Sequence, residues 1–242
     1  MRYLVVSDIH ANLVALEAVL ADAPAFDELW CLGDLVGYGP NPNECIERIQ
    51  DFPHYSLAGN HDWAALGKLD VKNFNTDARI ANTWTQAKLT PAAREYLDGL
   101  PTRIEQDGFC MAHASPREPV WEYILDANLA YANFAHFSTP ICLVGHTHIP
   151  LIFALDERRG RCEIVIPPIY DRLALRSPRM IVNPGSVGQP RDGDPWASYA
   201  LLDTEDQTWE FRRVAYAVEI TQERMRARGL PQRLIARLEV GR

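Results

Sequence analysis

Short apolar runs alternate with amphipathic segments along the first third of the chain. The continuous apolar run at residues 3–6 is typical of a buried parallel strand, and the runs at 29–32 and 55–58 predict two more strands. Helices are predicted between them over residues 12–20, where apolar side chains recur at helical spacing behind a capping Asn, and over residues 42–49. This alternation favours an α/β sheet layered with helices.

The pattern changes over residues 63–100, where apolar residues become sparse and two short helices are predicted at 77–88 and 91–97. Strand-like runs then return at residues 109–112, 141–144, 164–166, 180–182, 199–202 and 209–214. No Gly/Ser-rich linker divides the chain. We therefore expect one domain over residues 1–242, with a helical insertion at about 63–100 and a C-terminal helical segment at about 215–242.

Composition excludes several classes of protein. Hydrophobic residues make up 47% of the chain and charged residues 23%, which is ordinary globular usage and argues against a disordered or fibrous chain. No apolar run approaches the roughly 18 residues that a membrane span needs. The five cysteines contain no C-x-x-C pair and lie mostly in apolar runs, as small buried residues do in a reducing compartment. We expect a cytoplasmic protein.

Charge is distributed unevenly along the chain. The net charge of −8 argues against strong binding to nucleic acids or to anionic membranes. Residues 212–242, however, contain eight arginines and three glutamates, a balance of +5. This segment is interpreted either as a solvated helix face or as a helix pair that docks on the domain or on a second subunit, which would make the protein a homo-oligomer.

Side chains that can bind metals follow five of the predicted strands. They are Asp8 and His10, Asp34, Asn60, His113, and His146 and His148. Ligands of α/β sheets bind at the carboxyl ends of the strands. The i, i+2 spacing of Asp8 and His10, and of His146 and His148, would turn both side chains of each pair to one side of an extended segment. A single D-x-H or H-x-H motif is often only a hydrogen-bonded loop, but five such strand ends together favour a metal site.

The composition of this set indicates which metals it suits. Two carboxylates, four imidazoles and one amide oxygen are too many for one tetrahedral zinc and fit two divalent ions that share a carboxylate. The absence of a thiolate and the number of imidazoles favour Mn, Fe, Zn or Ni over Cu(I), Mg or Ca. We expect two divalent transition-metal ions, with Mn favoured.

These blocks, in this order, resemble the calcineurin-like metallophosphoesterase superfamily, in particular its small single-domain bacterial and archaeal branch. The resemblance runs from Asp8 to about Asp203 and includes the segments 37–40, 113–117 and 183–191. It implies an α+β fold, a four-layer sandwich of two mixed sheets flanked by helices. It also implies hydrolysis of a phosphodiester or phosphomonoester by attack of a hydroxide bound to two metal ions.

The resemblance also implies roles for individual residues. The first ion would be held by Asp8, His10 and His148, the second by Asn60, His113 and His146, and Asp34 would bridge them. His61, which we expect on a loop, would contact the substrate and assist the leaving group. Many phosphatases of the superfamily orient this histidine with a second Asp three residues after the bridging one, where this chain has Gly37. Asp62 is the neighbouring candidate for that task.

Other polar residues are candidates for the substrate site. Arg117 and Arg191 lie in Pro-rich loops and are interpreted either as contacts to a phosphate or as ordinary solvated arginines. Asn183 is expected to brace a metal ligand, and Tyr38 either to contact the leaving group or to pack beneath its loop.

A small phosphoester is the expected substrate, since an acidic body does not suit a processive nuclease. The alternatives are a phosphoprotein phosphatase, a non-catalytic scaffold that keeps the fold, and a metal-dependent sensor that binds a partner through its arginine-rich tail.

Overall fold

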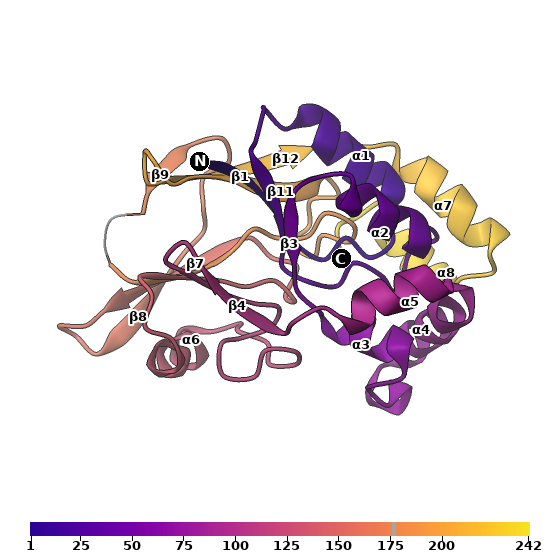
Figure 1. Ribbon diagram of the computed structural model, residues 1–242, viewed down its shortest axis with the longest axis horizontal. Coiled ribbons are helices and arrows are strands. Elements are labelled where there is room, and N and C mark those ends of the chain that lie inside the picture. The colour runs from indigo at the N-terminus through magenta and orange to yellow at the C-terminus, as the bar shows by residue number, and fades with distance from the viewer. Residues whose placement is uncertain (176–177) are drawn as a thin grey trace.

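Two six-stranded β-sheets face each other at the centre of the computed structural model, which describes residues 1–175 and 178–242 (Figure 1). The first sheet has the order β3 (His54–Ser56), β2 (Glu28–Cys31), β1 (Arg2–Val6), β11 (Ala197–Asp203), β12 (Thr208–Val214) and β9 (Arg172–Ala174). The second has the order β4 (Arg103–Gln106), β5 (Phe109–Ala112), β6 (Ile141–Leu143), β10 (Met180–Asn183), β7 (Leu151–Asp156) and β8 (Arg161–Val165). Both sheets contain parallel and antiparallel pairs.

Helices cover the outer faces of the two sheets. The apolar sides of α1 (Leu13–Asp22) and α2 (Pro42–Gln50) pack on the first sheet, and α6 (Ala127–Asn133), which leads into η2 (Phe134–His136), packs on the second. The molecule is therefore a sandwich of helices, sheet, sheet and helices, as the resemblance to the superfamily implies (Figure 1). Within the described residues, every helix is too short or too polar to cross a lipid bilayer.

Large side chains fill the space between the sheets. Tyr3, Val5 and Trp30 point inward from the first sheet and meet Met111 and Leu143 from the second, and all five are at most 1% exposed. Each such side chain contributes about 1.5–3 kcal/mol when it is fully removed from water. This core fixes the two sheets against each other and so brings their strand ends to common positions.

The segment between β3 and β4 is helical. It comprises α3 (Asn60–Leu66), η1 (Val71–Asn73), α4 (Thr76–Lys88) and α5 (Pro91–Asp98). The last two coincide closely with the helices expected at 77–88 and 91–97. Asn75 and Thr90 start them by accepting hydrogen bonds from the amides of Ala78 and Ala93.

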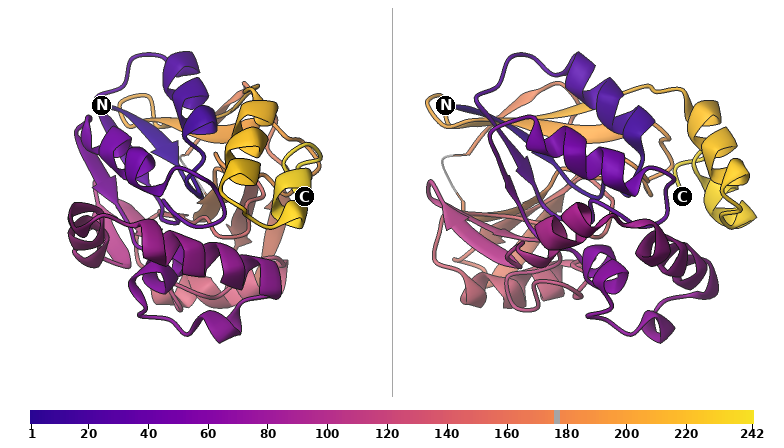
Figure 2. Two further views of the ribbon diagram at one scale, coloured as in Figure 1. Left: turned by 90° about the vertical axis from the view of Figure 1, so that its right-hand side faces the viewer. Right: turned by 45° about the vertical axis from the view of Figure 1, so that its right-hand side comes forward.

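The C-terminal segment forms two helices that dock on the body of the same chain. These are α7 (Val218–Ala227), beside α1, and α8 (Gln232–Arg237), near α4 (Figure 2). Met225, Leu234 and Ile235 pack with Ala78 and Ala81 of α4 in one buried cluster. Of the two interpretations of the arginine-rich tail, the structure therefore shows a docked helix pair, from which Arg226, Arg228 and Arg233 remain exposed.

Candidate metal centre

Seven ligand-type side chains meet at one end of the two sheets. They follow the carboxyl ends of β1, β2, β3, β5 and β6, and each is at most 3% exposed: Asp8, His10, Asp34, Asn60, His113, His146 and His148. Buried polar groups in such numbers must satisfy one another or a bound ion. The arrangement of their ligand atoms shows which of the two applies.

The first group of ligand atoms belongs to Asp8, His10, Asp34 and His148. The Nε2 atoms of His10 and His148 lie 3.1 Å apart, and the Asp8 Oδ1 atom lies 3.2 Å from the Nε2 atom of His148. The Asp34 Oδ2 atom lies 3.6 Å from the Nε2 atom of His10. These atoms surround a common point.

The second group of ligand atoms belongs to Asp34, His113 and His146. The His113 Nε2 atom lies 3.2 Å from the His146 Nδ1 atom and 3.2 Å from the amide oxygen of Asn60. The Asp34 Oδ2 atom lies 3.4 Å from the same nitrogen. Asp34 thus takes part in both groups, and one oxygen atom faces both.

Backbone carbonyls hold the four imidazoles by their outer nitrogens. The Nδ1 atoms of His10, His113 and His148 lie 3.1, 2.9 and 2.6 Å from the carbonyl oxygens of Val36, Leu32 and Gln189, and the Nε2 atom of His146 lies 3.2 Å from that of Trp121. A carbonyl can only accept, so each outer nitrogen carries the hydrogen. The inner nitrogen of each neutral ring then presents a lone pair, as a metal ligand must.

Two buried carboxylate oxygens give the clearest sign that this site fits a cation. Asp8 Oδ1 and Asp34 Oδ2 have no hydrogen-bond partner within the described part of the chain. The other oxygen of Asp8 accepts from the Ser7 hydroxyl and the His146 backbone amide, and the other oxygen of Asp34 accepts from the His61 backbone amide. Burial alone would raise the pKa of both groups. The attraction of His148 for Asp8 and of His113 for Asp34 outweighs burial and lowers both pKa values. Ionised oxygens that face lone pairs fit bound metal ions.

The pKa values of the imidazoles differ according to their neighbours. Burial lowers the pKa of His10 and His148, and lowers that of His146 to about 3. At His113 the attraction of Asp34 outweighs burial and raises the pKa to about 9. The rings of His10, His146 and His148 are therefore neutral at pH 7, so that they need not lose a proton to bind a metal ion.

The backbone of the centre is unusual. Asp8, His10, Asp34, His146 and His148 all have φ between 48° and 64°. This left-handed conformation costs an L-residue about 1–2 kcal/mol. The prediction that the D-x-H and H-x-H motifs lie in extended segments is thus wrong. The side chains converge because each strand ends in a tight turn.

His61 lies in the first turn of α3, not on a loop as we expected. Its Nδ1 atom is 2.9 Å from the side-chain oxygen of Asn82 on α4, and its backbone amide donates to Asp34 Oδ1 at 2.8 Å. The ring packs against Tyr38 and Phe74, with centroid distances of 4.3 and 5.0 Å. Burial lowers the pKa of His61 to about 4.

Asp62 does not take the place of the Asp that is missing at position 37. Its carboxylate accepts hydrogen bonds from the backbone amides of Leu35, Val36 and Gly59, with distances of 2.9–3.3 Å. Burial, reinforced by the nearby charge of Asp34, raises the pKa of Asp62 to about 7. Asp62 therefore ties together the two turns that carry Asp34 and Asn60, while Asn82 contacts His61.

Asn183 braces the turn that carries two of the histidines. Its amide nitrogen donates to the carbonyl of Gly145 at 2.7 Å and lies 2.9 Å from the hydroxyl of Thr147. Its oxygen accepts from the amide of Gly185. Asn183 thus acts on the backbone of the Gly145–His148 turn, with no contact to an imidazole ring among the hydrogen bonds of the described residues.

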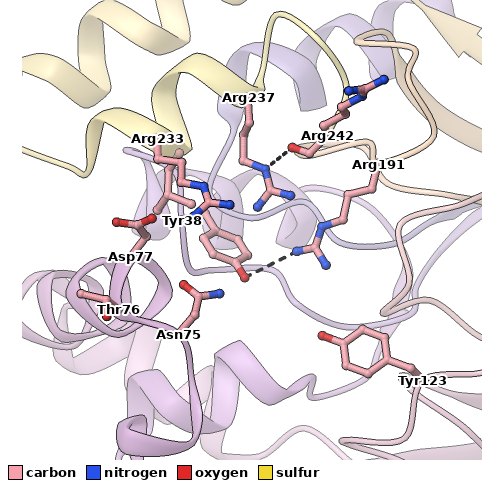
Figure 3. Close-up of a pocket in the computed structure, with 10 residues that line it drawn as sticks. Tyr38, Asn75, Thr76, Asp77, Tyr123, Arg191, Arg233, Arg237 and Arg242 are labelled. Carbon is pink, nitrogen blue, oxygen red and sulfur yellow. Dashed lines mark hydrogen bonds between the residues drawn. The ribbon is translucent and has the colours of Figure 1, made fainter.

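The two candidate arginines have different positions. The Arg117 guanidinium forms an ion pair with Glu122 at the surface. The Arg191 guanidinium lies 3.0 Å from the Gln189 side-chain oxygen and 3.4 Å from the Tyr38 hydroxyl, and it lines a pocket beside the metal-binding residues (Figure 3). Of the two arginines, Arg191 lines this pocket and Arg117 does not.

Sequence reasoning missed three residues around the site. Asn82 lies in α4, and nothing in the sequence of this helix indicates that its side chain contacts His61. Trp121 supplies the carbonyl that holds His146, and the Tyr123 ring stacks on the His146 ring with a centroid distance of 3.8 Å. No sequence signal marks these two aromatic residues, because their exposure of 41% each is a property of the folded chain.

Comparison with known proteins agrees with this geometry. Residues 1–207 match the model of the calcineurin-like phosphoesterase superfamily domain. The crystal structure of a metallophosphoesterase from Sphaerobacter thermophilus is 48% identical, covers 100% of this chain and 99% of its own, and superposes with a TM-score of 0.92. The uncharacterized protein MJ0912 of Methanocaldococcus jannaschii is 38% identical over 98% of this chain and 97% of its own length.

A more distant relative has a name that states an activity. Phosphodiesterase YfcE of Escherichia coli is 26% identical over 85% of this chain and 89% of its own length. The region matched by the superfamily model contains all seven ligand-type side chains. The chain belongs to the calcineurin-like phosphoesterase superfamily, and its buried Asp/His groups are able to bind metal ions.

Proposed function

We propose that this protein is a phosphoric ester hydrolase that uses two divalent metal ions, with Mn favoured, to cleave a phosphomonoester or phosphodiester. The observation that carries the proposal is the position of Asp34 Oδ2, which faces both groups of ligand atoms and has no hydrogen-bond partner within the described chain. Asp8, His10 and His148 would hold one ion, and Asn60, His113 and His146 the other.

Bound ions would supply two effects, a lower pKa for a coordinated water and compensation for the negative charge on the phosphoryl oxygens. The protein supplies rigidity. The carbonyls behind the four imidazoles and the amides that bind Asp8 and Asp34 fix each ligand atom before substrate arrives. Such prior orientation reduces the rearrangement needed during the reaction.

His61 is the candidate general acid for the leaving group. Because Asn82 accepts a hydrogen bond from Nδ1, the proton that the ring gains and loses is the one on Nε2. The pKa of about 4 reflects burial without a substrate, and a phosphate anion beside the ring would raise it toward neutrality. His61 would then protonate the departing oxygen as the phosphorus–oxygen bond breaks.

Arg191 is the candidate contact to the phosphoryl group. Its Nε atom is buried and has no hydrogen-bond partner among the described residues, while one Nη atom is held by Gln189. A guanidinium positioned in this way can offer two parallel hydrogen bonds to a phosphate. Arg191 would orient the substrate, and the ligand set would carry the chemistry.

The proposal is tested by measuring metal content together with hydrolysis of p-nitrophenyl phosphate and bis(p-nitrophenyl) phosphate. We expect turnover that is lost on chelation and restored by Mn²⁺. The ratio of the two rates assigns the monoester or diester preference. A protein that holds two metal ions and cleaves no ester in a wider screen of nucleotides and phosphopeptides would instead be a non-catalytic scaffold.

A further inference from the structure

The C-terminal segment supplies four of the ten residues that line the pocket beside the metal-binding residues. The volume of the pocket is about 530 Å³, and ten residues line it: Tyr38, Asn75, Thr76, Asp77, Tyr123, Arg191, Arg233, Leu234, Arg237 and Arg242. Figure 3 shows the guanidinium groups of Arg191, Arg233 and Arg237 around the ring of Tyr38. A volume of this size is typical of small-molecule sites and far exceeds that of one phosphate group.

The positive charge in this pocket is poorly compensated. None of Arg191, Arg233 and Arg237 forms an ion pair within the described residues, and Asp77 is the one acidic side chain among those that line the pocket. Burial and the repulsion of Arg191 and Arg233 lower the pKa of Arg237 to about 10. The Arg237 Nε atom donates to the main-chain oxygen of Arg242, and Arg191 donates to Gln189 (Figure 3 draws the first contact). Like charges that are held together without ion pairs favour the binding of an anion.

Two aromatic residues connect the pocket to the metal centre. Tyr38 lies 4.7 Å from the His10 ring and 4.3 Å from the His61 ring, measured between centroids. Tyr123 stacks on His146 and lines the same pocket. Two residues that line the pocket thus also contact imidazole rings of the candidate metal centre, so the pocket adjoins that centre through Tyr38 and Tyr123.

We propose that this pocket binds a second phosphate of the substrate, so that the preferred substrates carry at least two phosphoryl groups, as nucleoside diphosphates and their esters do. One phosphate would lie at the metal centre and the next against Arg191, Arg233 and Arg237. Guanidinium groups bind phosphate oxygens in pairs, and three that converge on one cavity suit a multiply charged group better than a neutral one. The proposal rests on the proposed function, since it extends the same site.

The docked position of α8 places two of its arginines at the pocket. Leu234 and Ile235 are buried against α4, so α8 is held in place by its apolar side. Arg233 and Arg237 are one turn apart and therefore project from the same side of the helix, toward the pocket. Two of the eight arginines of the tail are in this way directed at the pocket.

The test compares two inhibitors of the Mn²⁺-loaded enzyme, adenosine 5′-monophosphate and the hydrolysis-resistant α,β-methylene analogue of adenosine 5′-diphosphate, with free Mn²⁺ held constant. In the wild type we expect the diphosphate analogue to bind at least about tenfold more tightly. The double variant Arg233→Gln/Arg237→Gln should lose this advantage and keep its affinity for the monophosphate. Arg228→Gln removes one charge from an exposed position outside the pocket and should change neither value.

Two results would overturn the proposal. One is equal affinity of the wild type for both nucleotides, and the other is an equal loss of affinity in Arg228→Gln. If no ester is hydrolysed, the same comparison is made by isothermal titration calorimetry. Tight binding of the diphosphate analogue without turnover would support the phosphate-binding pocket and contradict the proposed function. Turnover of an ester with equal affinity for the two nucleotides would support the proposed function and contradict the phosphate-binding pocket.

Discussion

The side-chain oxygen of Asn82 lies 2.9 Å from the Nδ1 atom of His61. This contact joins α4 to the first turn of α3 and supplies the partner that the chain lacks at position 37. An amide oxygen accepts a hydrogen bond as a carboxylate does but brings no negative charge. It orients the imidazole without raising its pKa as strongly as an Asp would.

Replacing Asn82 should therefore affect turnover more than metal binding. For Asn82→Ala we expect about a tenfold lower kcat, because one hydrogen bond of ordinary strength is lost, and unchanged metal content. For His61→Gln the loss should reach about 10²–10⁴-fold, the usual contribution of a general acid. The exposed His136 gives the control His136→Gln, which should behave as wild type. Loss of metal in His61→Gln would show that His61 is a ligand.

Asn82→Asp should shift the pH profile in a defined direction. Burial holds the pKa of His61 low, and a carboxylate at position 82 would raise it. A general acid must be protonated, so activity falls as pH rises through its pKa in the enzyme–substrate complex. The alkaline limb of kcat against pH should therefore move to higher pH in Asn82→Asp. An unchanged limb would contradict the role of His61.

Gly37 lies where a side chain would displace His61. A Cβ atom at this position would come within 2.6 Å of the His61 Nδ1 atom, and the φ angle of Gly37 is +90°. Gly193 has the same φ angle, but a Cβ atom there would have no neighbour within 4 Å among the described residues, so Gly193→Ala reports backbone strain alone, about 1–2 kcal/mol. Gly37→Ala should lower the free energy of unfolding further and reduce kcat. Equal effects of the two substitutions on unfolding and activity would show that the contact is unimportant.

The two candidate arginines can be separated by kinetics. Arg191→Gln removes a guanidinium that lines the pocket, and we expect KM to rise about tenfold or more. Arg117→Gln removes one that pairs with Glu122 at the surface, and we expect little change in KM or kcat. Steady-state assays of both variants with one ester check the assignment. A larger effect of Arg117→Gln would reverse it.

The layered fold could be predicted because its strands are short, buried and apolar. Three strands escaped prediction. β4 lies at a sheet edge and three of its four residues are polar, and β9 contains only three residues, so neither presents an apolar run and their pairing depends on the tertiary structure. β7 does begin with an apolar run at residues 151–155, directly after Pro150, and its omission has no such physical reason.

The metal-binding side chains could be predicted from strand ends, since parallel strands bring their carboxyl ends together. Their orientation could not, because it depends on left-handed backbone at positions such as Asp8 and His10. Asn82 contacts a residue 21 positions earlier and belongs to a helix that looks ordinary in sequence. The arginine pocket likewise depends on where α8 docks, which charge counting alone cannot show.

The most direct test of the shared metal site is the metal stoichiometry of Asp34→Asn, measured by elemental analysis after loading with Mn²⁺. This variant keeps an oxygen for the His61 amide but removes the charge that faces both groups of ligand atoms. We predict two ions per chain in the wild type and in the exposed control Asp206→Asn, and a large loss of metal and of activity in Asp34→Asn. Two tightly held ions with near wild-type turnover in Asp34→Asn would contradict the shared site.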